Sequence, residues 1–250
     1  MPYMEERCKA GKTLEIRRYY DYQHHPKGEK RAVKEKPTPE RIKKANFKKA
    51  KRIITRLANA NFKDGDYLFR GDFFKKDITD VKMQKLIVKF IRKLRVAFKK
   101  EGKELKYIYC KEVGKRGGRH IHMLMPKCSL DFIRKCWTYG GIHIDPLYSN
   151  GQYKKIAEYF VKYSDKTAEN QEEEGRHIGK RWYPSQNLIK PVPIKKVISA
   201  KRFRREIRVP KGYYLDKDSV ENYISEETGY EYLAYTLIRT QIEQDYGGAY

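Results

Sequence analysis

The stretch that decides the fold runs from Leu105 to Pro126 and reads LKYIYCKEVGKRGGRHIHMLMP. Its first half is rich in β-branched and aromatic residues, and its second half, which begins at His120, alternates polar and apolar residues. Both halves therefore predict β-strands. Between Gly114 and Gly118 the chain has three glycines, which accept the backbone angles of a tight turn without steric cost. The stretch predicts an antiparallel hairpin.

Two histidines stand two residues apart on the second strand of this hairpin. Because side chains alternate along a strand, His120 and His122 point to the same side of the sheet. The hairpin also brings Glu112 back beside them, which predicts a His–His–Glu metal site. A slip of one residue in the register would move Glu112 to the other face. A His-x-His pair on an exposed strand is often only polar surface, so this stretch leaves both interpretations open.

Composition and charge limit the class of protein. The chain has 250 residues, of which 39% are hydrophobic, enough for one large domain or one domain with additions. Its net charge of +25 predicts a polyanionic partner, most often a nucleic acid. A solvated basic surface, or association with ribosomes or membranes, is the alternative. The chain has no long apolar run, no signal-peptide pattern and no Cys-x-x-Cys pair, so we expect reduced thiols, no membrane contact and a cytoplasmic location.

Outside the hairpin, the sequence predicts an open arm followed by alternating helices and strands. We expect a loose or partly extended arm over residues 1–36 and a basic amphipathic helix from Thr38 to about Asn61, where Thr38 is a plausible N-cap. Further elements are expected at Tyr67–Phe74 (strand), Asp80–Lys100 (helix), Ser129 to about Trp137 (helix) and Ile142–Ile144 (strand).

A second informative segment, QYKKIAEYFVKYSDK, runs from Gln152 to Lys166. Its aromatic residues recur at helical spacing. Tyr159 and Tyr163 are i,i+4 neighbours on one helix face, with Lys162 beside them and Lys166 one turn further on. The alternative is a stripe of core aromatics flanked by lysines that extend to solvent.

Together, the two segments resemble a known family. A His-hydrophobic-His strand followed by a helix with Tyr-x-x-Lys is similar to the HUH endonucleases, the nickases that initiate rolling-circle replication. The repeated Tyr-x-x-Lys-Tyr-x-x-Lys at 159–166 resembles their two-tyrosine branch, which includes phage A-type initiators and the Rep proteins of mobile elements. The matching region extends from about Asp66 to Lys166. The strand Leu68–Phe74 departs from the family's hydroxyl-containing pattern, so we assign it no role.

The resemblance implies a fold and a division of the chain. The fold class is α+β: an antiparallel sheet with packed helices, mainly on one face, like the ferredoxin-like HUH endonuclease core. The expected division is a basic N-terminal arm and helix at 1–63, the HUH nuclease core at 64–170, and a C-terminal extension at 171–250 that is first basic and then acidic.

The resemblance also implies an activity. The chain would be a metal-dependent, site-specific DNA endonuclease and strand transferase that nicks and rejoins single-stranded DNA at an origin through a 5′-phosphotyrosine. Tyr159 and Tyr163 would be the nucleophiles, supported by Lys162 and Lys166. In a competing version Tyr159 acts alone. A transposase or relaxase with the same chemistry, and a non-catalytic nucleic-acid-binding protein, are the alternative functions.

The expected cofactor is a divalent metal, Mg²⁺ or Mn²⁺, on His120, His122 and Glu112, because mixed nitrogen and oxygen donors suit these ions. The expected DNA partner is a single strand or an origin hairpin. The chain lacks a Gly-x-x-x-x-Gly-Lys-Ser/Thr phosphate loop. We therefore also expect a host helicase and polymerase as partners, in the cytoplasm of a bacterial host that carries a plasmid or phage.

Overall fold

The computed structural model describes residues 3–21, 38–75, 78–114, 116–162, 182–200, 202–225 and 229–240. The chain divides into two compact units. One consists of Met1–Ile42 together with Lys190–Tyr250, and the other of Lys43–Ile189. This division differs from the expected three parts, because the two ends of the chain form one unit.

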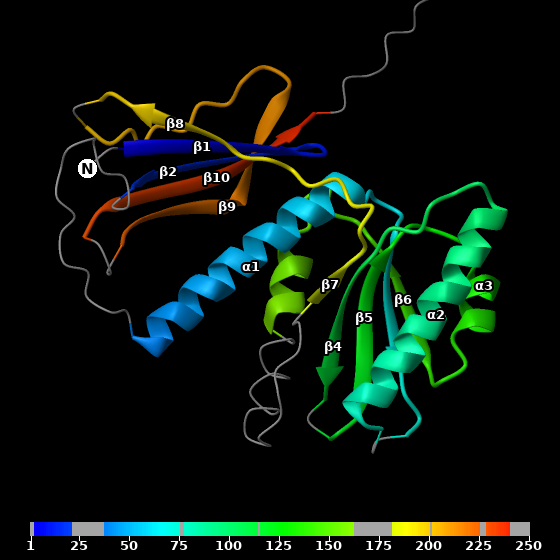
Figure 1. Cartoon of the computed structure of the whole chain (residues 1–250). Helices are drawn as coiled ribbons and strands as arrows, with labels where there is room; N and C mark the ends of the chain where they lie inside the picture. Colours follow the sequence, from blue (N-terminus) through cyan, green and yellow to red (C-terminus); the bar gives the residue numbers. More distant parts are fainter. Residues whose placement is uncertain are drawn as a thin grey trace, which may run out of the picture. The chain divides into compact units, whose positions relative to one another are not determined.

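The unit Lys43–Ile189 is built on a five-stranded antiparallel sheet (Figure 1). Its elements are β3 (Tyr67–Asp72), α2 (Asp80–Lys100), β4 (Ile108–Val113), β5 (Arg119–Met125), α3 (Leu130–Cys136), β6 (Ile142–Pro146) and β7 (Trp182–Pro184). The strand order is β6-β3-β5-β4-β7, and every neighbouring pair is antiparallel. The run from β3 to β6 has the β-α-β-β-α-β order of a ferredoxin-like unit. The expected α+β fold is confirmed.

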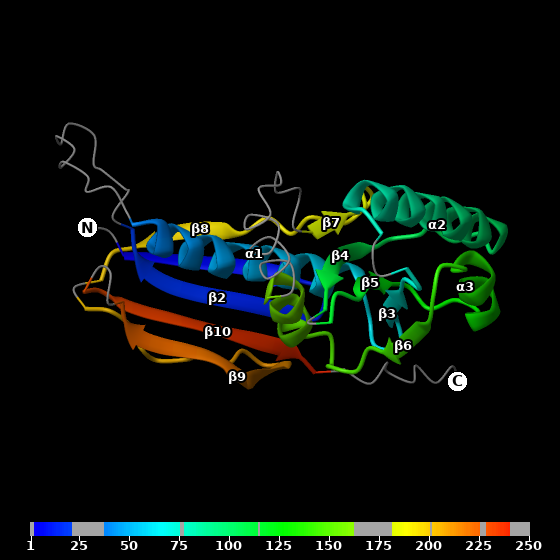
Figure 2. The ribbon, with the colours of Figure 1, turned by 90° about the horizontal axis from the view of Figure 1, so that it is seen from below.

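Local sequence explains why α2 forms where it does. Its N-cap Thr79 accepts a hydrogen bond from the backbone N–H of Lys82, and Lys99 and Lys100 in the last turn complement the negative end of the helix dipole. The helix buries an apolar stripe at a spacing of three to four residues: Met83, Ile87, Phe90, Ile91, Leu94 and Phe98. α2 and α3 lie on one face of the sheet (Figure 2), and the stripe packs there in the largest of the cores among the described residues.

Helices also pack on the opposite face of the same sheet. The C-terminal half of α1 (Pro39–Asn61) and the helical residues 154–162 pack there against Ile108 and Leu124. The expectation that the helices lie mainly on one face therefore holds for α2 and α3 only. The physical reason is that β4 and β5 are apolar on both faces at this end of the sheet, so both faces need cover.

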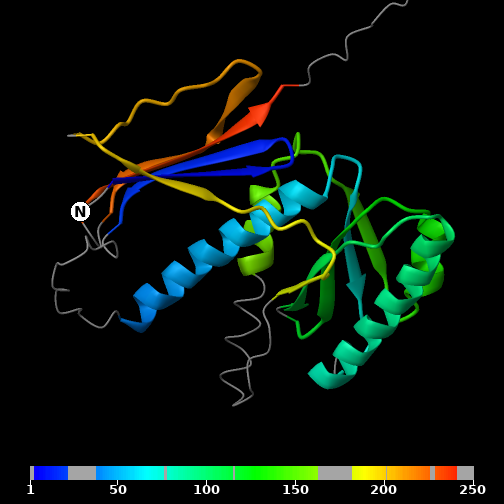
Figure 3. The ribbon, with the colours of Figure 1, turned by 45° about the horizontal axis from the view of Figure 1, so that its top comes forward.

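The second unit contains the other five-stranded antiparallel sheet (Figure 3). Its strands are β1 (Tyr3–Ala10), β2 (Thr13–Tyr20), β8 (Ile194–Ile198), β9 (Tyr213–Ile224) and β10 (Glu231–Arg239), in the order β8-β1-β2-β10-β9. The expected loose or partly extended arm is, over the described residues 3–20, extended but not loose: these residues form a hairpin that turns at Gly11 with φ of 57°. The hairpin is stable because strands from the far end of the chain flank it on both sides.

A buried ion pair holds this second sheet together. Arg18 of β2 donates to the carboxylate of Glu5 on β1 at 2.8 Å, and the two residues face each other in the ladder. The same guanidinium donates to the backbone carbonyls of Arg204 and Glu206. Burial would raise the pKa of Glu5, but hydrogen bonds from Arg18 and Arg7 outweigh it and lower that pKa.

No helix among the described residues is long and apolar enough to cross a membrane.

Candidate active site

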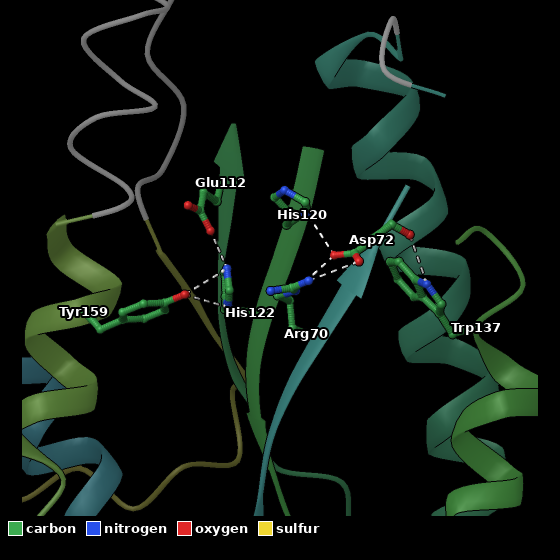
Figure 4. A network of polar contacts seen from close by, with 7 residues as sticks. All are labelled: Arg70, Asp72, Glu112, His120, His122, Trp137 and Tyr159. Atoms are coloured by element: carbon green, nitrogen blue, oxygen red, sulfur yellow. Dashed lines mark hydrogen bonds and ion pairs between the residues drawn. The ribbon is translucent and has the colours of Figure 1, made fainter. Parts of the chain in front are cut away.

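Three neighbouring strands bring the polar side chains of the candidate site together. In the β3–β5 ladder, Asp72 faces His120 and Arg70 faces His122, and in the β4–β5 ladder, Glu112 faces His120. Because residues opposite one another in a ladder share a face of the sheet, all five side chains lie on one face. The predicted return of Glu112 beside the two histidines is confirmed (Figure 4).

His122 and Glu112 form the deeper of two histidine–carboxylate pairs. Nε2 of His122 lies 2.5 Å from Oε2 of Glu112. The His122 side chain is only 3% exposed, and that of Glu112 is 14% exposed. A carboxylate that binds one ring nitrogen fixes both the tautomer and the orientation of the imidazole. The pair therefore holds His122 in one orientation within the sheet.

His120 and Asp72 form the second pair, at the rim of the same sheet. Nδ1 of His120 lies 2.7 Å from Oδ1 of Asp72, and Arg70 donates to both oxygens of that carboxylate at 3.1 and 3.3 Å. Burial would raise the pKa of Asp72, but the hydrogen bonds from Arg70 and His120 lower it. Asp72 is therefore an ionised acceptor at neutral pH.

Sequence reasoning assigned no role to Arg70 and Asp72, because their strand departs from the family pattern. One signal could have found them. In the strand Leu68–Phe74 the charged residues alternate with Phe69 and Gly71, and this alternation predicts that Arg70 and Asp72 share a face.

Tyr159 is the predicted nucleophile that the structure brings to the histidines. It lies within the helical residues 154–162, and its hydroxyl oxygen is 3.4 Å from each ring nitrogen of His122. The two rings meet edge to face, with centroids 5.0 Å apart. Lys162 is exposed near the end of the same helix. Tyr163 and Lys166, the other two predicted catalytic residues, lie outside the described residues.

The donor atoms of the site suit a divalent cation in type but form two separate pairs. Imidazole nitrogens and carboxylate oxygens are the ligands that Mn²⁺ accepts, and carboxylates suit Mg²⁺. In the described part of the chain, however, no three His, Cys, Asp or Glu side chains converge as a ready-made metal centre. Glu112 binds His122 and Asp72 binds His120. The metal site on His120, His122 and Glu112 stays a prediction.

A family comparison adds independent support. Residues 74–168 match the family model described as replication-associated protein ORF2/G2P. The resemblance to replication-associated proteins is confirmed. The match supports a role in DNA replication, and the matched stretch includes Glu112, His120, His122 and Tyr159. The matched stretch begins after Asp72, so only the structure assigns Arg70 and Asp72 to the site. Neither the curated proteins nor the solved structures contain a significant match to the chain.

Proposed function

We propose that this chain is a rolling-circle replication initiator that nicks and rejoins single-stranded DNA at an origin through a 5′-phosphotyrosine. The observation that carries the proposal is the position of Tyr159. Its hydroxyl lies beside a buried histidine of a His-x-His strand, within a stretch that matches a replication-associated family. The contact of this hydroxyl with the His122–Glu112 pair favours the catalytic interpretation of Tyr159 over a role in packing alone.

The proposed step balances without an outside energy source. The Tyr159 oxygen forms a bond to phosphorus while the bond from phosphorus to the 3′ oxygen breaks. The phenol proton leaves, and the departing 3′ oxygen takes up a proton. The energy of the phosphodiester is kept in the phosphotyrosine, so the reverse reaction can rejoin the strands. Because a free tyrosine phenol has a pKa of about 10, a cation at the site would favour the phenolate, and Lys162 and Lys166 are the lysines we propose for this role.

A divalent cation, Mg²⁺ or Mn²⁺, on His120, His122 and Glu112 would neutralise charge on the scissile phosphate. The orientation of His120 by Asp72 supports this assignment, because ligating histidines commonly donate their second nitrogen to a carboxylate that is not itself a ligand. Tyr163 would be a second nucleophile that attacks the regenerated origin while Tyr159 is occupied. Host enzymes would supply unwinding and synthesis.

Exposed lysines would provide most of the affinity for DNA. The N-terminal half of α1 exposes Lys43, Lys44, Lys48 and Lys49, and α2 exposes Lys82, Lys85 and Lys89. Contacts between lysines and phosphates release counterions and carry little sequence information. If the protein makes roughly 6–10 such contacts, its affinity for DNA should fall about 10³- to 10⁵-fold between 50 and 200 mM salt. If binding titrations show that the affinity for DNA hardly changes with salt concentration, the exposed lysines do not provide most of that affinity.

The direct test is to trap the covalent intermediate. The full chain is incubated with labelled single-stranded origin DNA and Mn²⁺, denatured, and examined for a protein–DNA adduct whose tyrosine is mapped by mass spectrometry. We expect the adduct on Tyr159, and on Tyr163 if both act. The double variant Tyr159→Phe/Tyr163→Phe should bind DNA and form no adduct.

Tyr148→Phe is the matched control, because Tyr148 is 77% exposed and lies outside the site. It should form the adduct normally. An adduct that persists in the double variant would move the nucleophile elsewhere in the chain. If the wild-type chain forms no adduct with origin DNA, the protein binds nucleic acid without cutting it.

A further inference from the structure

The His120–Asp72 pair at the rim of the site is held by more hydrogen bonds than an ordinary surface ion pair. The carboxylate of Asp72 accepts hydrogen bonds from Nδ1 of His120 at 2.7 Å and from Nε and Nη2 of Arg70 at 3.1 and 3.3 Å. An ionised carboxylate only accepts hydrogen bonds. The hydrogen of a neutral His120 ring is therefore on Nδ1, and the lone pair is on Nε2.

The backbone of Asp72 is fixed as firmly as its side chain. Its N–H donates to the carbonyl of Gly141 at 2.9 Å, and its carbonyl accepts from the indole N–H of Trp137 at 3.2 Å. Two glycines allow this close packing. A Cβ at Gly71 would meet the Trp137 ring at 2.6 Å, and a Cβ at Gly140 would lie 2.0 Å from the carbonyl oxygen of Asp72. Asp72 therefore has little freedom to move when a ligand binds its neighbour.

The opposite side of the His120 ring faces the glycine turn between β4 and β5. A Cβ at Gly114 would lie 3.2 Å from Nε2 of His120, and one at Gly118 would lie 3.4 Å from it. Nε2 of His120 therefore lies against a part of the turn where glycines carry no side chains. Figure 4 shows the ring with its Nδ1 side turned to Asp72 and its other nitrogen pointing away from that carboxylate.

We infer that Asp72 is a positioning residue, which holds His120 in the tautomer whose Nε2 lone pair faces the glycine turn, and that Arg70 holds Asp72 in place. The inference rests on the proposed function in one respect: the ligand that Nε2 would receive is the divalent cation. Asp72 itself binds no metal and touches no DNA in this account.

The isosteric variant Asp72→Asn tests the inference. An amide can either accept from Nδ1 or donate to it, so the shape is kept while the selection of one tautomer is lost. In metal-free protein, ¹⁵N NMR of the imidazole nitrogens should show His120 as the Nδ1–H tautomer in the wild type and as a mixture in Asp72→Asn. The affinity of the variant for Mn²⁺, measured by calorimetry, should fall by roughly 10- to 100-fold.

Asp145→Asn is the matched control. Asp145 contacts Nε2 of His143 at 3.2 Å on β6 of the same sheet, and both side chains are exposed. This variant should leave the His120 tautomer and Mn²⁺ affinity unchanged. If the two variants have equal thermal unfolding midpoints, a loss of Mn²⁺ affinity in Asp72→Asn results from the lost positioning of His120 and not from misfolding. Arg70→Gln should shift the tautomer and the affinity in the same direction as Asp72→Asn, to a smaller extent.

The inference fails if Asp72→Asn keeps the wild-type tautomer of His120, or if it keeps wild-type Mn²⁺ affinity. If the wild-type chain binds no Mn²⁺, the metal site of the proposed function fails. The NMR comparison in metal-free protein then decides by itself whether Asp72 selects the tautomer. The two failures are therefore distinguishable.

Discussion

The two five-stranded sheets use their charged residues in different ways. In the sheet built from β1, β2 and the C-terminal strands, carboxylates and guanidinium groups pair across strands: Glu5 with Arg18 and Glu6 with Arg17. In the sheet that contains β3, β4 and β5, the carboxylates of Asp72 and Glu112 bind histidines, and Asp72 also pairs with Arg70 on its own strand. An arginine–carboxylate pair stays ionised over the whole physiological range, whereas an imidazole can also bind a metal or move a proton.

This difference indicates a division of labour between the sheets. Arg18 binds Glu5 and two backbone carbonyls, so its role is to connect segments that lie far apart in the chain. His122 instead meets a carboxylate on one strand and a tyrosine hydroxyl from a helix. We therefore expect substitutions in the first sheet to change stability and substitutions in the second to change chemistry.

The largest expected effect is on chemistry. His122→Ala should slow adduct formation on the order of 10³-fold, because several kcal/mol of transition-state stabilisation are lost. The affinity for DNA should change little, because it comes mainly from contacts with phosphates. Gel assays of the adduct and binding titrations measure the two quantities. The control is His143→Ala, which replaces an exposed histidine of the same sheet. It should leave adduct formation and DNA affinity unchanged. Normal nicking by His122→Ala, or by the wild type in excess chelator, would contradict the metal site.

The next effect is on stability. Glu5→Ala leaves the buried Arg18 without its carboxylate and should lower the free energy of unfolding by about 3–5 kcal/mol. Glu206→Ala removes an exposed carboxylate paired with an exposed arginine and should cost only about 0–1 kcal/mol. Urea unfolding measures both. Adduct formation per folded molecule should be unchanged in Glu5→Ala, and a strong loss there would break the proposed division of labour.

A smaller effect links stability to the site. Gly140→Ala places a methyl group against the backbone of Asp72 and should destabilise the protein by about 1–3 kcal/mol through overpacking. Gly141→Ala brings its methyl group only to ordinary contact with the Asp72 side chain, at 3.4 Å. Comparison of the two unfolding midpoints checks the prediction. Equal midpoints would show that the backbone of Asp72 can move at little cost.

The smallest effect is on pH dependence. The pKa of Glu5 is lowered in the folded protein, so its stabilising contribution is complete above the ordinary value of about 4.3 and is lost as the pH falls through the lowered folded value. Unfolding midpoints measured between pH 7 and pH 3 should therefore decline below about pH 4.3. The decline should be weaker in Glu5→Gln. The pKa of Asp72 is also lowered, but its greater exposure makes its contribution to stability smaller. An equal decline in Glu5→Gln would contradict the assignment to Glu5.

Local patterns of sequence determined much of the site. The bounds of α2 follow from a cap, a 3.6-residue apolar period and the basic last turn, all of which act within a few residues. The shared face of His120 and His122 follows from strand alternation, and the return of Glu112 beside them follows from a short glycine turn. Each of these features depends on neighbours in the chain, so the sequence by itself determines it.

Tertiary structure decided which distant strands pair. Asp72 reaches His120 across 48 positions of sequence because β3 lies next to β5. Strand β1 pairs with β8, and β2 pairs with β10, although β8 and β10 lie near the other end of the chain. The backbone of a strand does not specify which other strand pairs with it, because the unpaired N–H and C=O groups are the same on the edge of every strand. The choice of partner follows from the packing of whole sheets and helices, and for this reason the first strand pair and the role of Asp72 appear only in the folded chain.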